Sequence, residues 1–142
     1  MDAQRFFNAV ADLLACDAAR AEAVSFAVFQ ELRDRLTPTE ARDVAAQLPT
    51  ALKTLWGEGA DPHRPANRVN KVHADEFIGR VRKRAVLADD AEAERAVRAV
   101  FRTLRGLLGS ASGLEGEAWD IFSQLPKDMK PLWLEIGEPT TK

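Results

Sequence analysis

The sequence has no tyrosine, one cysteine and two histidines among its 142 residues. The single cysteine, Cys16, cannot form a disulfide within the chain, which is typical of a protein kept in a reducing cytoplasm. Cys16, His63 and His73 do not have the spacing of a structural zinc site. The sequence therefore predicts a cytoplasmic protein that holds no metal ion and no other cofactor.

Long apolar runs are also missing. The longest apolar stretches, such as AVSFAVF, are far shorter than the ~20 residues that a membrane-spanning helix needs. The first ten residues, MDAQRFFNAV, have an acidic second residue and no basic region before an apolar run, so they do not predict a secretory signal. We therefore expect no membrane partner.

Neither sign of charge dominates the chain. The 20 lysines and arginines nearly balance the 22 aspartates and glutamates. A protein with this balance has no overall field that would attract nucleic acid, an anionic membrane or an acidic substrate. Any such partner would need a local patch of charge.

The apolar residues that are present favour helix over sheet, with 24 Ala and 15 Leu against 10 Val and 3 Ile. One ten-residue phrase occurs twice, as QLPTALKTLW at residues 47–56 and as QLPKDMKPLW at residues 124–133. Its proline ends the incoming helix and suits the first position of the next one, so each phrase predicts a corner between two helices. The repetition indicates two structural units with the same ending.

Each phrase ends in a tryptophan, Trp56 or Trp133. Helical spacing places each tryptophan on the apolar side of the helix that follows the corner. One interpretation is that the two rings are core plugs that fill the corner against the unit's own interior. The other is that they are exposed interaction anchors for a partner.

The first half of the chain predicts four helices. Apolar spacing predicts the first helix at about residues 3–15, and Asp17 predicts the start of the second. Glu31 and Arg35 lie one turn apart and predict a favourable pair on the surface of that helix. The sequence TPTE at residues 37–40 combines a threonine cap, a proline at the first helical position and a glutamate that can close a capping box. A third helix is therefore expected to begin there.

The same pattern restarts in the second half. Phe77 lies 71 residues after Phe6, whereas the two tryptophans of the phrase lie 77 residues apart, so added residues fall in turns. We predict an all-α helical bundle of two tandem three-to-four-helix repeats, related by a pseudo-twofold axis and sharing one core. The predicted divisions are repeat 1 at residues 1–58, a connector at 59–74, repeat 2 at 75–137 and a tail at 138–142.

The second half combines Phe77, Ile78 and Val81, an acidic turn, an Ala/Arg-rich helix with Phe101 and Leu104, a glycine-rich turn, and Glu117 before QLP, and the first half has Glu40 and Ala41 before QLP. This order of features resembles the bacterial family called domain of unknown function 2267. The resemblance covers nearly the whole chain apart from the connector and the tail, and the QLP phrase is its most specific part. It implies an all-helical bundle in a bacterial cytoplasm, and it implies no activity and no catalytic residues.

Two groups of residues could in principle carry chemistry. Cys16 with His63 or His73 could form a nucleophile and its base, but a small thiol beside apolar residues is more commonly structural. The acids at residues 89–94 are better explained as a helix start, where carboxylates interact favourably with the helix dipole. No catalytic residue is predicted, and we predict that the protein is not an enzyme.

One segment departs from the mixed charge background. Residues 62–84 hold seven arginines and lysines against two acids. The main hypothesis is a non-enzymatic interaction or adaptor protein that binds another protein or a second copy of itself. The alternative is phosphate or nucleic-acid binding through the basic stretch at residues 64–84. The anion-binding patch of that alternative consists of Arg64, Arg68, Lys71, Arg80, Lys83 and Arg84.

Overall fold

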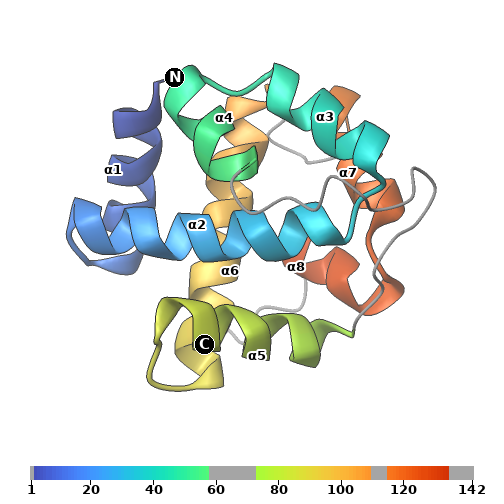
Figure 1. Cartoon of the computed structure of the whole chain (residues 1–142). Helices are drawn as coiled ribbons and strands as arrows, with labels where there is room; N and C mark the ends of the chain where they lie inside the picture. The colour runs from blue at the N-terminus through green and yellow to red at the C-terminus, as the bar shows by residue number, and fades with distance from the viewer. Residues whose placement is uncertain (1, 58–72, 110–114, 135–142) are drawn as a thin grey trace.

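A computed structural model of the chain describes residues 2–57, 73–109 and 115–134. Helices and the turns between them account for all of these residues, so the predicted all-α class is confirmed for the described part (Figure 1). Most of the predicted connector and the whole predicted tail lie outside it. The elements are α1 (Ala3–Leu14), α2 (Ala18–Asp34), α3 (Pro38–Ala46), α4 (Thr50–Gly57), α5 (Ala74–Ala85), α6 (Asp90–Leu107), α7 (Gly116–Gln124), the 3-10 helix η1 (Lys127–Met129) and α8 (Lys130–Leu134).

Aspartate caps begin the two long helices. The backbone N–H of Arg20 donates to Oδ1 of Asp17 at 2.8 Å, and the backbone N–H of Glu92 donates to Oδ1 of Asp89 at 2.8 Å. Each bond satisfies one of the N–H groups that lack a partner in the first turn of a helix. The acids at residues 89–94 therefore start α6, as predicted.

The QLP phrases form corners, as predicted, but each proline lies one position earlier than expected. Pro49 directly precedes α4, and its carbonyl accepts from the N–H of Lys53 at 2.8 Å. Pro126 directly precedes η1, and its carbonyl accepts from the N–H of Met129 at 2.9 Å. Each proline thus occupies the cap position of the new helix. An N–H at that position has no partner within the helix, so the helix loses no bond when proline stands there.

The TPTE motif caps α3 in a different way from the one predicted. The N–H of Glu40 donates to Oγ1 of Thr37 at 3.2 Å, which is the expected first half of a capping box. The N–H of Thr37 donates to Oε1 of Gln124 at 2.9 Å, so a glutamine of the second phrase closes the cap. The prediction that Glu40 closes the box is therefore wrong, and its carboxylate faces α7.

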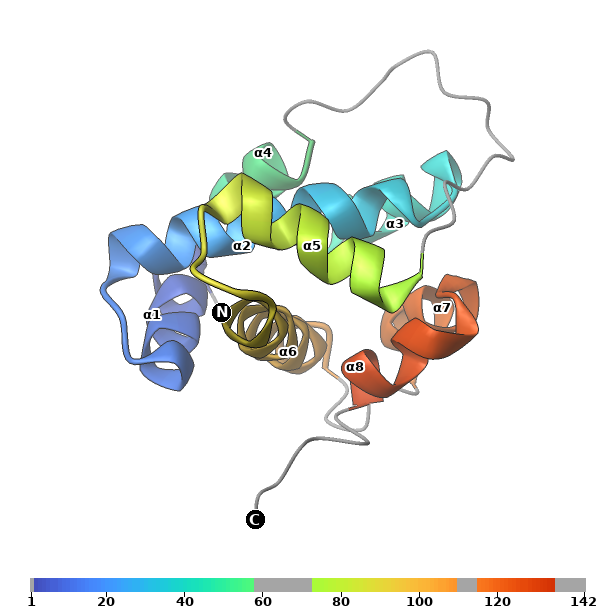
Figure 2. The same cartoon turned by 90° about the horizontal axis from the view of Figure 1, so that it is seen from below.

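Helix α2 lies at the centre of the molecule (Figures 1 and 2). It packs against α1 and α4 of its own half and against α5 and α6 of the other half. One continuous cluster of buried apolar side chains includes residues from both halves. Most residues of α2 from Val24 onward are buried as a result, because each of its neighbours covers part of its surface.

The two halves repeat the same ring contacts. Phe6 lies 5.5 Å from Phe29, and Phe77 lies 6.0 Å from Phe101, measured between ring centroids. Across the halves α1 packs on α6 and α2 packs on α5, two contacts that change places when the halves are exchanged. This pattern agrees with a twofold relation, and the axis itself stays a prediction.

Candidate functional site

Trp56 and Trp133 are both buried in the core. Trp56 lies 5.6 Å from Phe29 and Trp133 lies 5.2 Å from Phe101, each pair in a T-shaped arrangement. The indole Nε1–H of Trp56 donates to the carbonyl of Ala41 at 2.9 Å, so its polar edge is satisfied inside. In this conformation neither ring is accessible to a partner, which is the arrangement that a core plug requires.

The basic stretch is described only from α5 onward, since Arg64, Arg68 and Lys71 lie outside the described residues. Arg80 and Lys83 are exposed on α5. The guanidinium of Arg84, by contrast, pairs with the carboxylate of Glu31 on α2. The neighbouring Arg82 pairs with Asp90 at 2.8 Å. Two of the four basic side chains at the end of α5 therefore already have acidic partners.

Glu31 has a structural position that the sequence did not predict. Its carboxylate is buried between α2 and α5, with Arg84 on one oxygen and Arg35 Nη1 at 3.7 Å from the other. The predicted surface pair of Glu31 and Arg35 is therefore wrong in its location, because α5 of the second half covers this part of α2. Burial makes the carboxylate dependent on its arginine partners.

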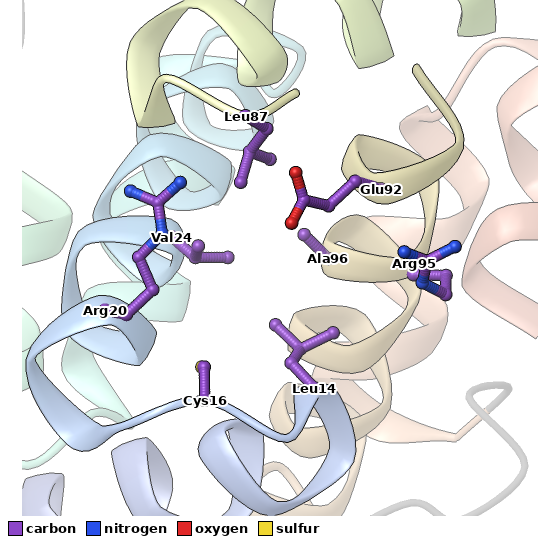
Figure 3. Close-up of a pocket in the computed structure, with 8 residues that line it drawn as sticks. All are labelled: Leu14, Cys16, Arg20, Val24, Leu87, Glu92, Arg95 and Ala96. Carbon is purple, nitrogen blue, oxygen red and sulfur yellow. The ribbon is translucent and has the colours of Figure 1, made fainter. Parts of the chain in front are cut away.

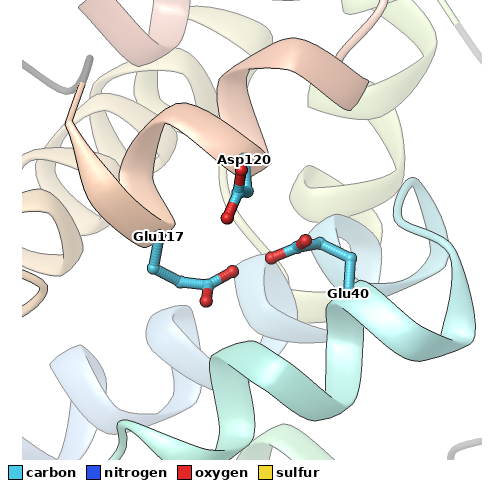
Figure 4. Close-up of side chains that lie close together, drawn as sticks. All are labelled: Glu40, Glu117 and Asp120. Atoms are coloured by element: carbon cyan, nitrogen blue, oxygen red, sulfur yellow. The ribbon is translucent and has the colours of Figure 1, made fainter.

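Three carboxylates meet where α3 packs on α7 (Figure 4). One oxygen from each of Glu40, Glu117 and Asp120 lies within 4.8 Å of the others. Glu40 comes from α3, whereas Glu117 and Asp120 lie one turn apart on α7 and therefore share a face of that helix. We refer to these three residues as the carboxylate cluster. It contains residues from both halves of the molecule.

The surroundings of the carboxylate cluster leave two oxygens without donors. Gln47 Nε2 donates to Oε1 of Glu117 at 3.2 Å, while Oε2 of Glu117 and Oε2 of Glu40 are buried and accept no hydrogen bond. Burial raises the pKa of Glu117 above its ordinary value, and the nearby Asp120 carboxylate raises it further. The cluster is thus a site of concentrated negative charge with unused acceptor atoms.

A second feature of α7 is exposed aromatic surface. The side chain of Trp119 is 47% exposed and its ring lies 5.6 Å from that of Phe122. Lys130 Nζ lies 4.9 Å from the centroid of the Phe122 ring. We refer to Trp119, Phe122 and Lys130 as the α7 aromatic surface, and it combines apolar area with a positive charge.

The chain matches the sequence model of a known protein family. The sequence model of the family described as uncharacterized conserved protein (DUF2267) matches residues 3–132. The chain belongs to this family. A search of curated proteins finds no match.

In this DUF2267 protein, a cavity of ≈ 60 Å³ lies between the α1–α2 corner and the start of α6 (Figure 3). Cys16, Arg20 and Glu92 are among the residues that line it. Burial raises the pKa of the Cys16 thiol, the Asp17 carboxylate raises it further, and Arg20 opposes both effects. A raised pKa reduces the thiolate fraction, which is the opposite of what an activated nucleophile needs.

The histidines do not complete a catalytic pair with Cys16 in the described residues. His73 precedes α5, where its Nδ1 lies 3.4 Å from Asp128, whereas Cys16 faces Leu87 beyond the other end of that helix. His63 lies outside the described residues. None of the described helices has the length and apolar character needed to cross a membrane.

The carboxylate cluster was missed in the sequence, although the repeat contains a signal for it. Glu40 precedes Gln47 by seven residues, and Glu117 precedes Gln124 by the same interval. Equivalent positions of two repeats meet each other if they lie near the axis that relates the repeats. The sequence does not show where the predicted axis lies, so it does not predict that Glu40 and Glu117 are neighbours.

Proposed function

We propose that this DUF2267 protein is a non-enzymatic, cytoplasmic interaction protein that binds another protein through the α7 aromatic surface. The observation that supports it most directly is the half-exposed ring of Trp119 on a short helix. Tryptophan is the residue most enriched among those that contribute strongly to binding at protein interfaces. The proposal places the binding site on the second repeat, away from the buried Trp56 and Trp133.

Trp119 differs from the other exposed apolar side chains of the described residues. Leu13 is 46% exposed and Val86 is 79% exposed, and both are aliphatic. Trp119 lies against the partly buried ring of Phe122, so the two rings form a continuous aromatic face. A rigid aromatic face loses little conformational entropy on binding and offers a large apolar contact area.

The charge at the rim indicates the chemistry of the partner. The ammonium of Lys130 lies over the Phe122 ring, and Lys127 is exposed nearby in the sequence. On α7, the side chain of Asp120 is directed toward Glu40 (Figure 4). We therefore expect the partner to present an apolar side chain flanked by acidic residues, because opposite charges at a rim favour association.

The test compares Trp119→Ala with Leu13→Ala, a control that removes a similarly exposed apolar side chain elsewhere. Proteins retained from a native cell lysate by the wild type are purified and titrated with both variants. We expect Trp119→Ala to bind such a partner about thirtyfold more weakly and with unchanged helicity. Equal affinity of the two variants would contradict the proposal.

Self-association is measured in the same set of variants. Sedimentation velocity over a range of concentrations is expected to give a monomer for the wild type. A dimer that disappears in Trp119→Ala would instead make a second copy of the chain the partner, and would overturn the proposal of a different protein.

The second candidate function is phosphate or nucleic-acid binding, which is supported by the exposure of Arg80 and Lys83 on α5. Arg84 is left unchanged in the test because its removal would leave the buried Glu31 with less compensation. The variant Arg80→Gln/Lys83→Gln is compared with Arg5→Gln/Lys53→Gln, which removes two exposed positive charges elsewhere. Binding of duplex or single-stranded nucleic acid at low salt, lost only in the first variant and falling steeply with salt, would favour this function.

A further variant examines the part of the basic stretch outside the described residues. Arg64→Gln/Arg68→Gln/Lys71→Gln is titrated under the same conditions. If the wild type binds neither nucleic acid nor inorganic phosphate at low salt, the anion-binding alternative is wrong and all these variants behave alike.

A further inference from the structure

We propose that Glu40, Glu117 and Asp120 bind one hard divalent cation at the contact between α3 and α7. This site goes beyond the proposed function and does not depend on it. The three side chains point toward one another from two helices that belong to different halves of the chain (Figure 4). A bound cation would therefore link the repeats.

The negative charge of the cluster is not balanced by basic side chains of the described residues. Three carboxylates lie within 4.8 Å of one another, and among the described residues no arginine or lysine forms an ion pair with any of them. Arginine neutralises the buried Glu31 elsewhere in the same molecule. Like charges at this separation repel, and a cation placed between them reverses the sign of the interaction.

Two buried carboxylate oxygens of the cluster lack hydrogen-bond donors. Glu40 is only 7% exposed, its Oε2 accepts no hydrogen bond, and its side chain points toward Glu117 and Asp120 (Figure 4). Buried carboxylate oxygens normally accept hydrogen bonds or coordinate metals, because leaving them unsatisfied is costly. Oε2 of Glu117 is also buried and accepts no hydrogen bond, although the residue as a whole is partly exposed.

Gln47 prepares Glu117 for such a role. Its Nε2–H donates to Oε1 of Glu117 at 3.2 Å, which fixes one carboxylate oxygen and leaves Oε2 available. Hydrogen bonds of this kind commonly orient the ligands of a metal ion. On the other side of the contact, Gln124 accepts from the N–H of Thr37 and so holds the end of α7 against the start of α3.

The donor set identifies the class of ion. The cluster offers carboxylate oxygens, without a thiolate or an imidazole, and this is the ligand type of Mg²⁺, Ca²⁺ and Mn²⁺. Asp120 is exposed, so water can reach the cluster from its side and complete the coordination shell. We expect millimolar to micromolar affinity of the kind shown by partly hydrated carboxylate sites.

The experiment measures thermal unfolding of the full chain after treatment with EDTA. MgCl₂, CaCl₂ or MnCl₂ is then added, and KCl of the same ionic strength corrects for screening. At a hundredfold excess over the dissociation constant, the best of the three ions is expected to raise Tm by roughly 5–10 °C. Calorimetric titration with that ion is expected to give one ion per chain.

Variants decide whether the shift arises at the cluster. Glu40→Gln and Asp120→Asn are expected to abolish it, and the exposed position of Asp120 makes its variant the one that keeps the fold. Asp43→Asn is the matched control, because Asp43 occupies on α3 the repeat position of Asp120 and lies outside the cluster. A shift that is equal in all variants, or absent in the wild type, would overturn the proposal.

One outcome would replace the cation with a proton. If none of the three ions changes Tm, but Tm rises as the pH falls through the acid range and Glu117→Gln removes that rise, the carboxylates share a proton and the cation proposal is wrong. If the metal-dependent shift occurs, lowering the pH is expected to weaken it, because protons compete for the same oxygens.

Discussion

A buried arginine makes the same hydrogen bond in each half of the molecule. Arg33 Nη1 donates to the carbonyl of Trp56 at 3.1 Å, and Arg105 Nη1 donates to the carbonyl of Trp133 at 2.8 Å. Carbonyls in the last turn of a helix lack a partner within the helix, and each tryptophan lies near the end of a short one. Each arginine therefore connects a long helix to the end of the short helix that follows the QLP corner. Its charged side chain lies inside the protein because it makes this hydrogen bond.

The buried tryptophans predict a large loss of stability on truncation. Trp56→Ala and Trp133→Ala are each expected to lower the free energy of unfolding by ~3–5 kcal/mol, because both rings are buried against phenylalanines. Urea denaturation measures the change. Trp119→Ala, at a half-exposed ring, serves as the control and is expected to cost less than ~1 kcal/mol. Similar losses at all three positions would contradict the assignment of Trp56 and Trp133 to the core.

The Cys16 thiol is expected to react slowly. Its pKa is raised, first by burial and then by Asp17, so at mildly alkaline pH less of it is thiolate than in an unfolded chain. We expect a thiol-specific reagent to modify the folded protein several-fold more slowly than the protein in urea, with the rate still rising at pH values where free cysteine has levelled off. A folded-state rate equal to that in urea would show that the fold neither shields the thiol nor raises its pKa.

At the scale of single helices, local patterns predicted the boundaries well and distant contacts changed the details. The caps at Asp17 and Asp89 depend on bonds within three residues, so the sequence around them was sufficient. The N–H of Thr37 donates to the side chain of Gln124, which lies 87 residues away in the sequence, and no local motif predicts that bond. Tertiary packing overrode the local capping box in the same way that it buried Glu31.

The ends of α1 and α5 provide a prediction about helix termination. Each helix is followed by a residue in the left-handed region, Ala15 or Val86, both with φ of 55°. A β-branched side chain is strained there, and Val86 is 79% exposed, so it contributes little packing. Val86→Gly is therefore expected to raise the free energy of unfolding by ~0.5–1 kcal/mol after the entropy of glycine in the unfolded chain is included.

The measurement for Val86 is urea denaturation of the wild type and three variants. Val86→Ala, which removes the branch but keeps a Cβ, is expected to fall between the wild type and Val86→Gly. Ala15→Gly is expected to gain less than Val86→Gly, because alanine at Ala15 is not β-branched. A loss of stability in Val86→Gly would mean that the side chain makes a contribution beyond its exposed surface.

For the whole molecule, the internal repeat was the most informative feature of the sequence. The doubled QLP phrase and the spacing of Phe6 and Phe77 predicted that the second half follows the helix order of the first, and composition with apolar spacing predicted the all-α class. The carboxylate cluster could not be predicted in the same way, because it depends on how one repeat faces the other. Periodicity specifies which side of a helix is apolar, whereas the contact between α3 and α7 is set by the packing of all the helices.

The two halves of the chain are expected to depend on each other for stability. A chain ending at Glu58 would lose the contacts of α2 with α5 and α6 and those of α1 with α6, and it would leave the buried carboxylate of Glu31 without Arg84. A unit of about 60 residues buries too small a fraction of its surface to tolerate such losses easily. Circular dichroism is expected to show that residues 1–58 unfold at a lower temperature and less cooperatively than the whole chain. Adding residues 59–142 as a separate chain is expected to restore part of the lost stability, since the core crosses between the halves; melting of residues 1–58 alone that matches the whole chain would show instead that the first half has a core of its own.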